Sequence, residues 1–113
     1  MVIKFSDTKK FPIKDWVVWD YPMPSKEVGI SYQQIKSRVP EKGWCLNKVC
    51  QEMFFIVKGS GIFYVGDQSY EVNVKDLVIV EPKVKHRIET RDLEYIAITR
   101  PDWYEGQYEE VDD

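Results

Sequence analysis

The chain has 113 residues, of which 43% are hydrophobic and 14% aromatic, enough for one folded core but not for a second domain. Its formal net charge is -3 and its Lys and Arg residues are scattered, so it lacks the basic stripe that tracks nucleic-acid phosphates. No window is long and apolar enough to span a bilayer, and the first residues show no apolar secretion signal. We therefore expect a single-domain cytoplasmic protein without nucleic-acid or membrane partners.

Between Trp16 and Arg100 the sequence consists of short runs rich in β-branched and aromatic residues, separated by turn residues. No stretch has sustained helical periodicity. The predicted strands are 16–21, 28–39, 52–58, 61–66, 69–74, 76–81, 86–89 and 93–99. We expect residues 1–27 to form an N-terminal strand extension. Residues 101–113 are acidic and are expected to form a solvated tail, with one helical turn near Trp103.

The segments between these runs have the composition of turns. Gly59-Ser60-Gly61 and Gly66-Asp67-Gln68 are typical of hairpins, and residues 90–92 form a short polar link. Consecutive strands are therefore predicted to be antiparallel neighbours. This profile predicts an all-β sandwich or barrel.

Alternation along two runs predicts which side chains face the core. Tyr70, Val72 and Val74 alternate with polar residues, which predicts one buried and one solvated face. Residues 77–80 are all apolar and predict a buried strand. Two cysteines, Cys45 and Cys50, are five positions apart on an extended segment, so they point to opposite faces and are expected to stay reduced.

Two stretches carry the spacing of a pair of motifs. In EMFFIVKGSGIFYVG, Glu52 is followed after six residues by Gly59. In KDLVIVEPKVKHRIE, Asp76, Pro82 and His86 stand at the spacing of the second motif. Residues 43–89 thus resemble the cupin superfamily, in particular a small single-domain cupin of the type-2 kind. The resemblance implies a cupin-type double-stranded β-helix, an antiparallel jelly-roll barrel with a pocket at one end.

The only histidine, His86, is predicted to point into this barrel. Pro82 ends the preceding strand, and Val84, His86 and Ile88 then share one parity on the next strand. A core imidazole satisfied by its neighbours is the alternative interpretation. The motif spacing of His86 relative to Pro82 and Glu52 favours a position of His86 in the pocket.

The resemblance also implies a degenerate metal site. In the family, two histidines six and four residues before the glutamate help to bind a divalent metal. Those positions are Leu46 and Lys48 here, and neither is a plausible ligand. We therefore predict no cofactor and no metal-ligating residue.

A divalent metal held by Glu52, His86 and a substitute ligand is the alternative. Cys50 could supply a sulfur ligand, and Asn47 or Gln51 an oxygen ligand. Cys50 on a strand is also typical of a small core residue.

Further candidate ligand contacts come from parity along two segments. Lys48, Cys50 and Glu52 share a parity, so they line one face if no bulge intervenes. Lys48 would then replace the metal as a fixed positive charge; the alternative is an edge lysine that reaches solvent. Tyr32 and Gln34 share a parity on the strand predicted to flank the pocket, and they are candidates for polar contacts.

Three functions remain open at this point. The first is a cupin that binds a small polar or anionic metabolite, either sugar-like or a keto acid, with a neutral His86 beside Glu52 as a possible general base. The second is a metal-dependent dioxygenase, isomerase or epimerase. The third is a non-catalytic dimerisation or sensing module. The hydrophobic content, and the way in which small cupins pair, lead us to expect a homodimer. The sequence assigns no catalytic residue and no substrate.

Overall fold

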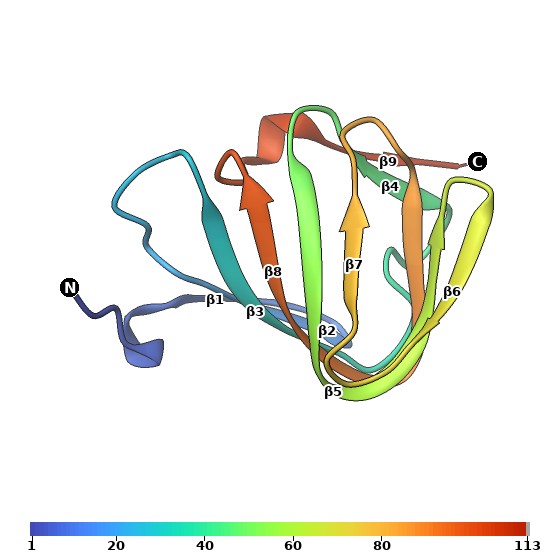
Figure 1. Ribbon diagram of the computed structural model, residues 1–113, viewed down its shortest axis with the longest axis horizontal. Coiled ribbons are helices and arrows are strands. Elements are labelled where there is room, and N and C mark those ends of the chain that lie inside the picture. Colours follow the sequence, from blue (N-terminus) through green and yellow to red (C-terminus); the bar gives the residue numbers. More distant parts are fainter. Residues whose placement is uncertain (113) are drawn as a thin grey trace.

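The computed structural model describes residues 1–112, which form one curled antiparallel sheet of nine strands (Figure 1). The strands are β1 (Lys9–Ile13), β2 (Trp16–Asp20), β3 (Gly29–Ile35), β4 (Trp44–Asn47), β5 (Gln51–Val65), β6 (Gln68–Val72), β7 (Leu77–Val80), β8 (His86–Arg100) and β9 (Tyr108–Val111). Two short 3-10 turns, η1 (Phe5–Asp7) and η2 (Glu105–Gln107), complete the described residues. Neither is long and apolar enough to span a membrane. The all-β antiparallel prediction is confirmed.

Two long strands, β5 and β8, run through both sides of the curled sheet and pair with each other along most of their length. The C-terminal half of β8 pairs with β3, which continues to β2 and β1. The start of β8 pairs with β4, and β4 pairs with β9. On the other edge, β7 pairs with the first half of β5 and β6 with the second half. The curl places a cavity between the two sides, in the manner of a jelly roll.

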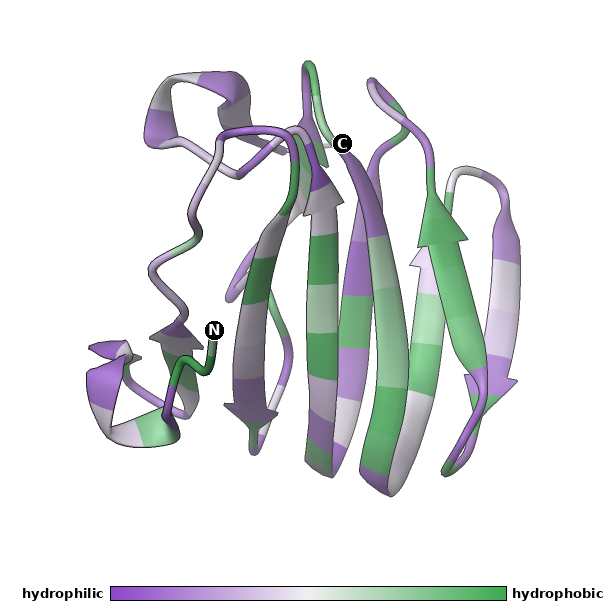
Figure 2. Ribbon diagram, turned by 60° about the vertical axis from the view of Figure 1, so that its left-hand side comes forward, coloured by the Kyte–Doolittle hydropathy of each residue, from purple (hydrophilic) through white to green (hydrophobic). Residues whose placement is uncertain are grey.

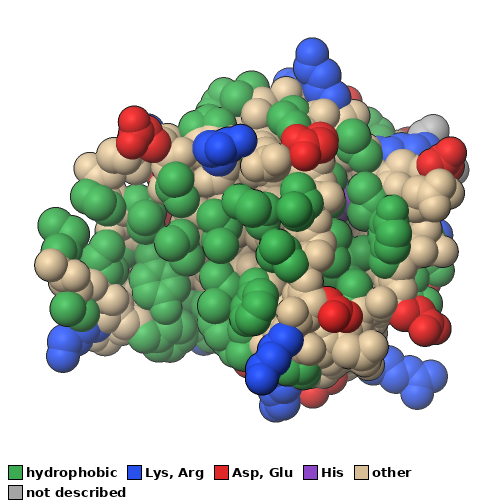
Figure 3. Space-filling model, in the orientation of Figure 1, with side chains coloured by type: hydrophobic (Ala, Val, Ile, Leu, Met, Phe, Trp, Pro, Cys, Tyr) green, Lys and Arg blue, Asp and Glu red, His purple; other side chains and the backbone are tan. Residues whose placement is uncertain are grey.

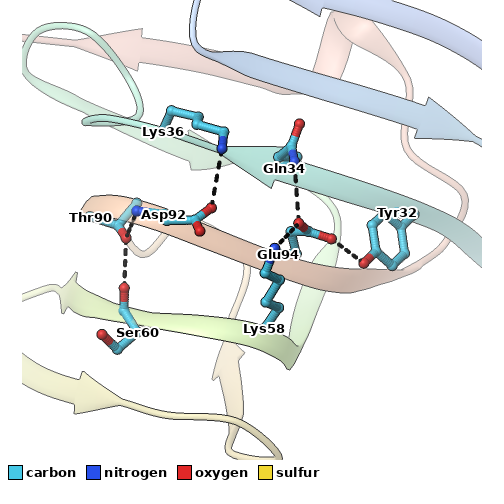
Figure 4. Close-up of polar contacts among 8 residues, drawn as sticks. All are labelled: Tyr32, Gln34, Lys36, Lys58, Ser60, Thr90, Asp92 and Glu94. Atoms are coloured by element: carbon cyan, nitrogen blue, oxygen red, sulfur yellow. Dashed lines mark hydrogen bonds and ion pairs between the residues drawn. The ribbon is translucent and has the colours of Figure 1, made fainter.

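The predicted break between residues 52–58 and 61–66 is wrong, as is the break between 86–89 and 93–99. Each pair is one continuous bent strand. Gly59 has a φ of 82°, and the β5–β8 register shifts between Ser60 and Gly61, where Arg91 of β8 is the extra residue, so the strands bend here at a bulge and β5 does not turn back as a hairpin. Thr90 fixes the bend from the other strand, because its Oγ1 donates to the Ser60 carbonyl oxygen at 2.6 Å (Figure 4).

The hairpin predicted at Gly66 is confirmed, since it joins β5 to β6 with a φ of 60°. The predicted alternation along the next run is wrong. Of its three apolar residues only Val72 is buried, whereas Tyr70 and Val74 are about half exposed. The run 77–80 is likewise not fully buried, because Leu77 and Ile79 point to the outside of the curl. An antiparallel sheet has one solvent-facing side, and a run of apolar residues does not reveal which of its members lie there.

The acidic C-terminal segment is not a solvated tail. After η2, strand β9 pairs with β4, with Tyr108 opposite Asn47 and Glu110 opposite Cys45. Gln107 is fully buried between these elements. The segment 101–112 is therefore part of the barrel wall; Asp113, the last residue of the predicted tail, lies outside the described residues.

The core lies inside the curl and consists of apolar side chains from both halves of the long strands. Phe54 packs edge-on against Phe63 and Tyr95, with ring centroids 5.1 Å apart in both pairs. The remaining core residues are Ile35, Val39, Ile56, Val72, Val78, Val80, Ile88, Leu93 and Ala97. In Figure 2, hydrophobic and hydrophilic residues alternate along several of the strands, and successive side chains of a strand point to opposite faces of the sheet.

The outer side of the curl carries a second set of apolar residues. In the register, Ile79, Met53 and Ile98 form one row across β7, β5 and β8, and a parallel row is formed by Leu77, Phe55 and Ile96. We call these six residues the outer apolar face. Hydrophobic side chains cover this side of the molecule in Figure 3, over the strands that Figure 1 labels β7, β5 and β8.

Candidate functional site

The curled sheet holds a cavity of about 580 Å³, a size typical of small-molecule sites. Strands β1, β2, β3, β4, β5 and β8 and the C-terminal segment contribute to its wall. Its aromatic lining residues are Phe11, Trp16, Phe54, Tyr95, Trp103, Tyr104 and Tyr108. Its polar lining residues include Asp20, Gln33, Cys45, Glu52, His86, Thr99, Asp102, Glu105 and Glu110.

Glu52 projects from β5 into this cavity. Its carboxyl group is enclosed by protein, and Asn47 Nδ2 donates a hydrogen bond to its Oε1 at 2.8 Å. Burial raises the pKa of Glu52 to about 7, and the hydrogen bond from Asn47 offsets this rise only in part. Glu52 therefore gains and loses a proton near neutral pH, as a general acid or base must.

The Asn47 amide is held in one orientation by Gln107. The Gln107 Oε1 accepts hydrogen bonds from the backbone N–H groups of Val49 and Cys50, so its Nε2 faces Asn47 and donates to Oδ1 at 2.8 Å. Because Oδ1 of Asn47 is thereby an acceptor, its Nδ2 must point to Glu52. A chain of fixed amides thus runs from the C-terminal segment to the buried carboxyl group.

Trp103 joins the same chain from the cavity wall. Its indole Nε1 donates to Asn47 Oδ1 at 3.2 Å, while its ring lines the cavity and is 44% exposed. A molecule that contacts the Trp103 ring would therefore touch a residue that is hydrogen-bonded to Asn47, the partner of Glu52.

His86 lies at the start of β8 and is buried, as its parity predicted. Its Nε2 is 3.4 Å from Cys45 Sγ, and its Nδ1 makes no hydrogen bond of ordinary geometry to residues 1–112. Burial lowers the pKa of His86 to about 4, and the Val84 backbone offsets only part of this shift. His86 is thus neutral but a weak base at neutral pH, so Glu52 is the group whose protonation changes there.

One part of the cavity wall is a hydrogen-bonded polar network around Gln33. Trp16 Nε1 and the Tyr95 hydroxyl both donate to Gln33 Oε1, at 2.8 and 2.7 Å. Gln33 Nε2 in turn donates to Ser31 Oγ at 3.0 Å. Since these polar groups have partners within the wall, they shape the cavity and leave other lining groups, among them Glu52, His86, Thr99 and Asp102, to contact a ligand.

The structure places Lys48 and Cys50 outside the cavity. Strand β4 ends at Asn47, and the bend that follows breaks the parity expected to unite Lys48, Cys50 and Glu52. Lys48 is exposed, with its Nζ 4.0 Å from Glu109 Oε2. The Cys50 thiol instead contacts the carbonyl oxygen of Pro101 at 3.3 Å.

Tyr32 and Gln34 also lie away from the cavity, on the opposite face of β3 from Gln33. Both contact Glu94 of β8: the Tyr32 hydroxyl donates to Oε1, and Gln34 Nε2 donates to Oε2 at 3.2 Å (Figure 4). Lys58 adds an ion pair to the same carboxylate at 3.7 Å. These residues form a polar cluster on the outside of the sheet and not the flank of a pocket.

The polar end of the cavity does not fit the metal-ligand set of the family. Across residues 1–112, no three His, Cys, Asp or Glu side chains are grouped so that they could hold a metal ion. The side chains of β4 that contact His86 and Glu52 are Cys45 and Asn47, whereas Lys48, which was predicted to line this face, lies outside the cavity. Asn47 directs an amide N–H group inward, and burial raises the pKa of the Cys45 thiol to about 12, which keeps it protonated. Cys50 and Gln51 do not line this end.

Sequence reasoning missed the contribution of the C-terminal segment. Trp103, Tyr104 and Tyr108 all line the cavity, although they lie in a stretch read as a tail. Three aromatic residues in a short acidic stretch were the available signal, because a solvated tail has no reason to contain them.

Comparison with protein families shows that this chain belongs to the cupin domain family, whose model matches residues 41–99. Comparison with curated protein sequences gave no significant match. The assignment agrees with the motifs around Glu52 and His86.

Solved structures share the fold at low sequence identity. Streptomyces PAC13 with uridine superimposes with a TM-score of 0.87 at 14% identity, over 97% of this chain and 89% of that chain. Another structure of Pac13, described as a nucleoside dehydratase, gives 0.85 at 15% identity, over 99% and 91%. Lactobacillus farciminis oxalate decarboxylase in a formate complex gives 0.77 at 12% identity and covers 94% of this chain, which spans only 34% of that enzyme.

Proposed function

We propose that this cupin binds an uncharged, hydroxyl-bearing small molecule in its cavity and exchanges a proton with it through Glu52. The observation that carries the proposal is the position of Glu52, enclosed at the cavity wall with a pKa of about 7. A carboxyl group held near its own pKa serves equally as acid and base. The neutral His86, which lines the same cavity, provides a donor or acceptor for the same ligand.

The charge of the cavity favours a neutral ligand over an anionic one. Five acidic residues line it, namely Asp20, Glu52, Asp102, Glu105 and Glu110. No Lys or Arg occurs among the described lining residues, and Lys48, the cation expected to bind an anion, is outside. A keto acid would meet repulsion here, whereas hydroxyl groups donate readily to carboxylates. Of the two ligand classes considered from sequence, the sugar-like one is supported.

The aromatic lining favours a ligand with a planar part. Phe11, Trp103 and Tyr104 are at least 40% exposed and lie on the cavity wall, where their rings offer faces for stacking. A nucleoside combines a planar base with a hydroxyl-bearing sugar, and solved structures with this fold contain uridine. Uridine is therefore the first probe that we would use.

The chemistry open to such a site is proton transfer at a carbon next to an activating group. In an elimination of water, a base removes a proton from carbon and an acid protonates the departing hydroxyl group. In an isomerisation, the proton returns to a different carbon. Glu52 can serve in either reaction because its proton occupancy changes near neutral pH.

The test is a binding titration with the wild type and Glu52→Gln. We expect uridine to shift the NMR signals of cavity residues in the wild type, and to bind more weakly to Glu52→Gln. Glu109→Gln, which removes a carboxylate on β9 outside the cavity, is the matched control. Pyruvate and 2-oxoglutarate should not bind; tight binding of either, with no response to uridine or neutral sugars, would overturn the proposal.

A metal-dependent enzyme is the competing function, and elemental analysis separates the two. One equivalent of a transition metal in protein purified without an affinity tag, lost in His86→Ala, would favour the metalloenzyme. A non-catalytic sensing module would bind ligand without turnover, so product analysis by mass spectrometry after incubation with a bound ligand distinguishes it.

We also propose that the chain forms a homodimer through the outer apolar face. Leu77, Ile79 and Phe55 on this face are 53%, 49% and 38% exposed, and they lie in adjacent rows. A contiguous exposed apolar patch of this kind is unusual on a monomer. The polar cluster beside it contains both Lys58 and Glu94, so a two-fold axis can bring opposite charges together.

A further inference from the structure

A second group of polar side chains lines the cavity next to Glu52. In the strand register, Glu52 of β5 is opposite Thr99 of β8, and Thr99 is opposite Gly29 of β3. Directly opposed residues project to the same face with their Cβ positions about 5 Å apart. Thr99 therefore follows Glu52 along the inner wall, and Gly29 leaves the next position without a side chain.

Asp102 occupies the space above Gly29. A Cβ atom at Gly29 would lie 2.3 Å from Asp102 Oδ1 and 2.7 Å from Thr99 Oγ1, so both oxygens approach the same point. They are therefore at most about 5 Å apart, yet Thr99 Oγ1 makes no hydrogen bond to Asp102. One hydroxyl group placed between the two oxygens can bond to both.

The Thr99 hydroxyl group lacks a hydrogen-bond partner within residues 1–112. Thr99 is only 5% exposed, and its Oγ1 is buried without a hydrogen-bond partner among residues 1–112. Leaving such a group unpaired costs stability, and native proteins contain few of them. A ligand hydroxyl group in the cavity would satisfy it.

Asp20 of β2 is a second carboxyl group that lines the cavity and interacts electrostatically with Asp102. Burial raises the pKa of Asp20, and the negative charge of Asp102 raises it further. Both residues line the cavity. This end of the site is therefore rich in acceptors and suits a ligand with several hydroxyl donors.

We propose that Thr99, Asp102 and Asp20 bind the vicinal hydroxyl groups of a sugar ring, an assignment that rests on the function proposed above. One hydroxyl group bridges Thr99 and Asp102, accepting from the threonine and donating to Oδ1. Its neighbour donates to a remaining oxygen of Asp102 or Asp20. The ring then extends along the row toward Glu52, which contacts a carbon beyond the diol.

Isothermal titration with uridine and 2′,3′-dideoxyuridine tests this assignment, because the two differ only in the diol. For the wild type we expect uridine to bind about tenfold or more tightly than the dideoxy compound. In Thr99→Val and Asp102→Asn the advantage of uridine should shrink, while the affinity for 2′,3′-dideoxyuridine stays unchanged. Thr99→Ser keeps the hydroxyl group and should keep the preference; Glu109→Gln is the charge control.

Equal binding of the two nucleosides to the wild type would overturn the diol subsite and leave the cavity function intact. If Thr99→Val weakened the binding of both nucleosides equally, the diol subsite would likewise be overturned and the cavity function would stand. If uridine, 2′,3′-dideoxyuridine and methyl β-D-ribofuranoside all fail to bind at millimolar concentration, both proposals are wrong. Thermal unfolding of each variant verifies that it is folded before its titration is interpreted.

Discussion

Asn47 Nδ2 donates a hydrogen bond to Glu52 Oε1 at 2.8 Å, and this contact favours the ionised form of a carboxyl group that burial would otherwise keep protonated. In Asn47→Asp the donor is lost and a carboxylate takes its place, while the side chain keeps its size. We expect the pKa of Glu52 to rise from about 7 by one unit or more. A carbon-13 NMR titration of labelled glutamate measures it.

Gln51→Glu is the matched control for this amide-to-carboxylate change. Gln51 contacts Glu81 on the exposed side of β5, where solvent screens the added charge. An unchanged Glu52 pKa in Asn47→Asp, or an equal shift in the control, would show that the contact does not tune the carboxyl group.

Glu52 should also make the stability of the protein depend on pH. Its folded pKa of about 7 exceeds its usual value of 4.5, so the folded state holds a proton that the unfolded state has released between these values. Stability from this group is thus fully present below about pH 4.5 and is lost as the pH rises to about 7. Relative to the wild type, Glu52→Gln should become more stable on going from pH 5 to 7.5, by about 2 kcal/mol.

Urea denaturation at both pH values measures this difference. His86 acts in the opposite direction: its folded pKa of about 4 lies below the usual 6.5, so its contribution is present above pH 6.5 and is lost on acidification. When His86→Phe is added to Glu52→Gln, the free energy of unfolding should therefore fall less on acidification than it does in Glu52→Gln alone. Glu109→Gln, at an exposed carboxylate, is the control; a difference as large as that of Glu52→Gln would refute the assignment to the buried carboxyl group.

Gln107 should be important for stability although it lies in the acidic C-terminal segment. Gln107→Met keeps most of the volume but leaves two backbone N–H groups and Asn47 Oδ1 without this partner. We expect a loss of about 2 to 4 kcal/mol in the free energy of unfolding, measured by urea denaturation. The exposed Gln68→Met on β6 is the control and should change it little; equal stabilities would mean that the C-terminal segment does not depend on this network.

The outer apolar face should hold the proposed dimer together. Phe55→Glu places a charge in the middle of the face and should yield a monomer in light scattering at micromolar concentration. Tyr70→Glu introduces the same charge at a comparably exposed residue on β6, outside the face, and should leave the dimer intact. A monomeric wild-type protein would contradict the proposal directly.

The motif register and local alternation were sufficient to predict an antiparallel cupin barrel and the inward position of His86. These features depend on short-range patterns, since parity along a strand and proline at its end act within a few residues. The continuity of β5 and β8 was not predictable in this way. Gly59 is compatible with either a hairpin or a bulge, and only pairing with the strand that contains Thr90 selects the bulge.

The sequence by itself thus determined the fold class and predicted that Glu52 and His86 line the cavity, where the structure has both. Only the tertiary structure decided their companions, because the bend after β4 takes Lys48 out of the parity of Glu52 and leaves Cys45 beside His86 and Asn47 beside Glu52. It also decided that Gln107 and Trp103 reach the site, since β9 pairs with a strand some 60 residues earlier in the chain. Long-range pairing, burial and the pKa shifts that follow from burial are properties of the folded chain, and no local pattern contains them.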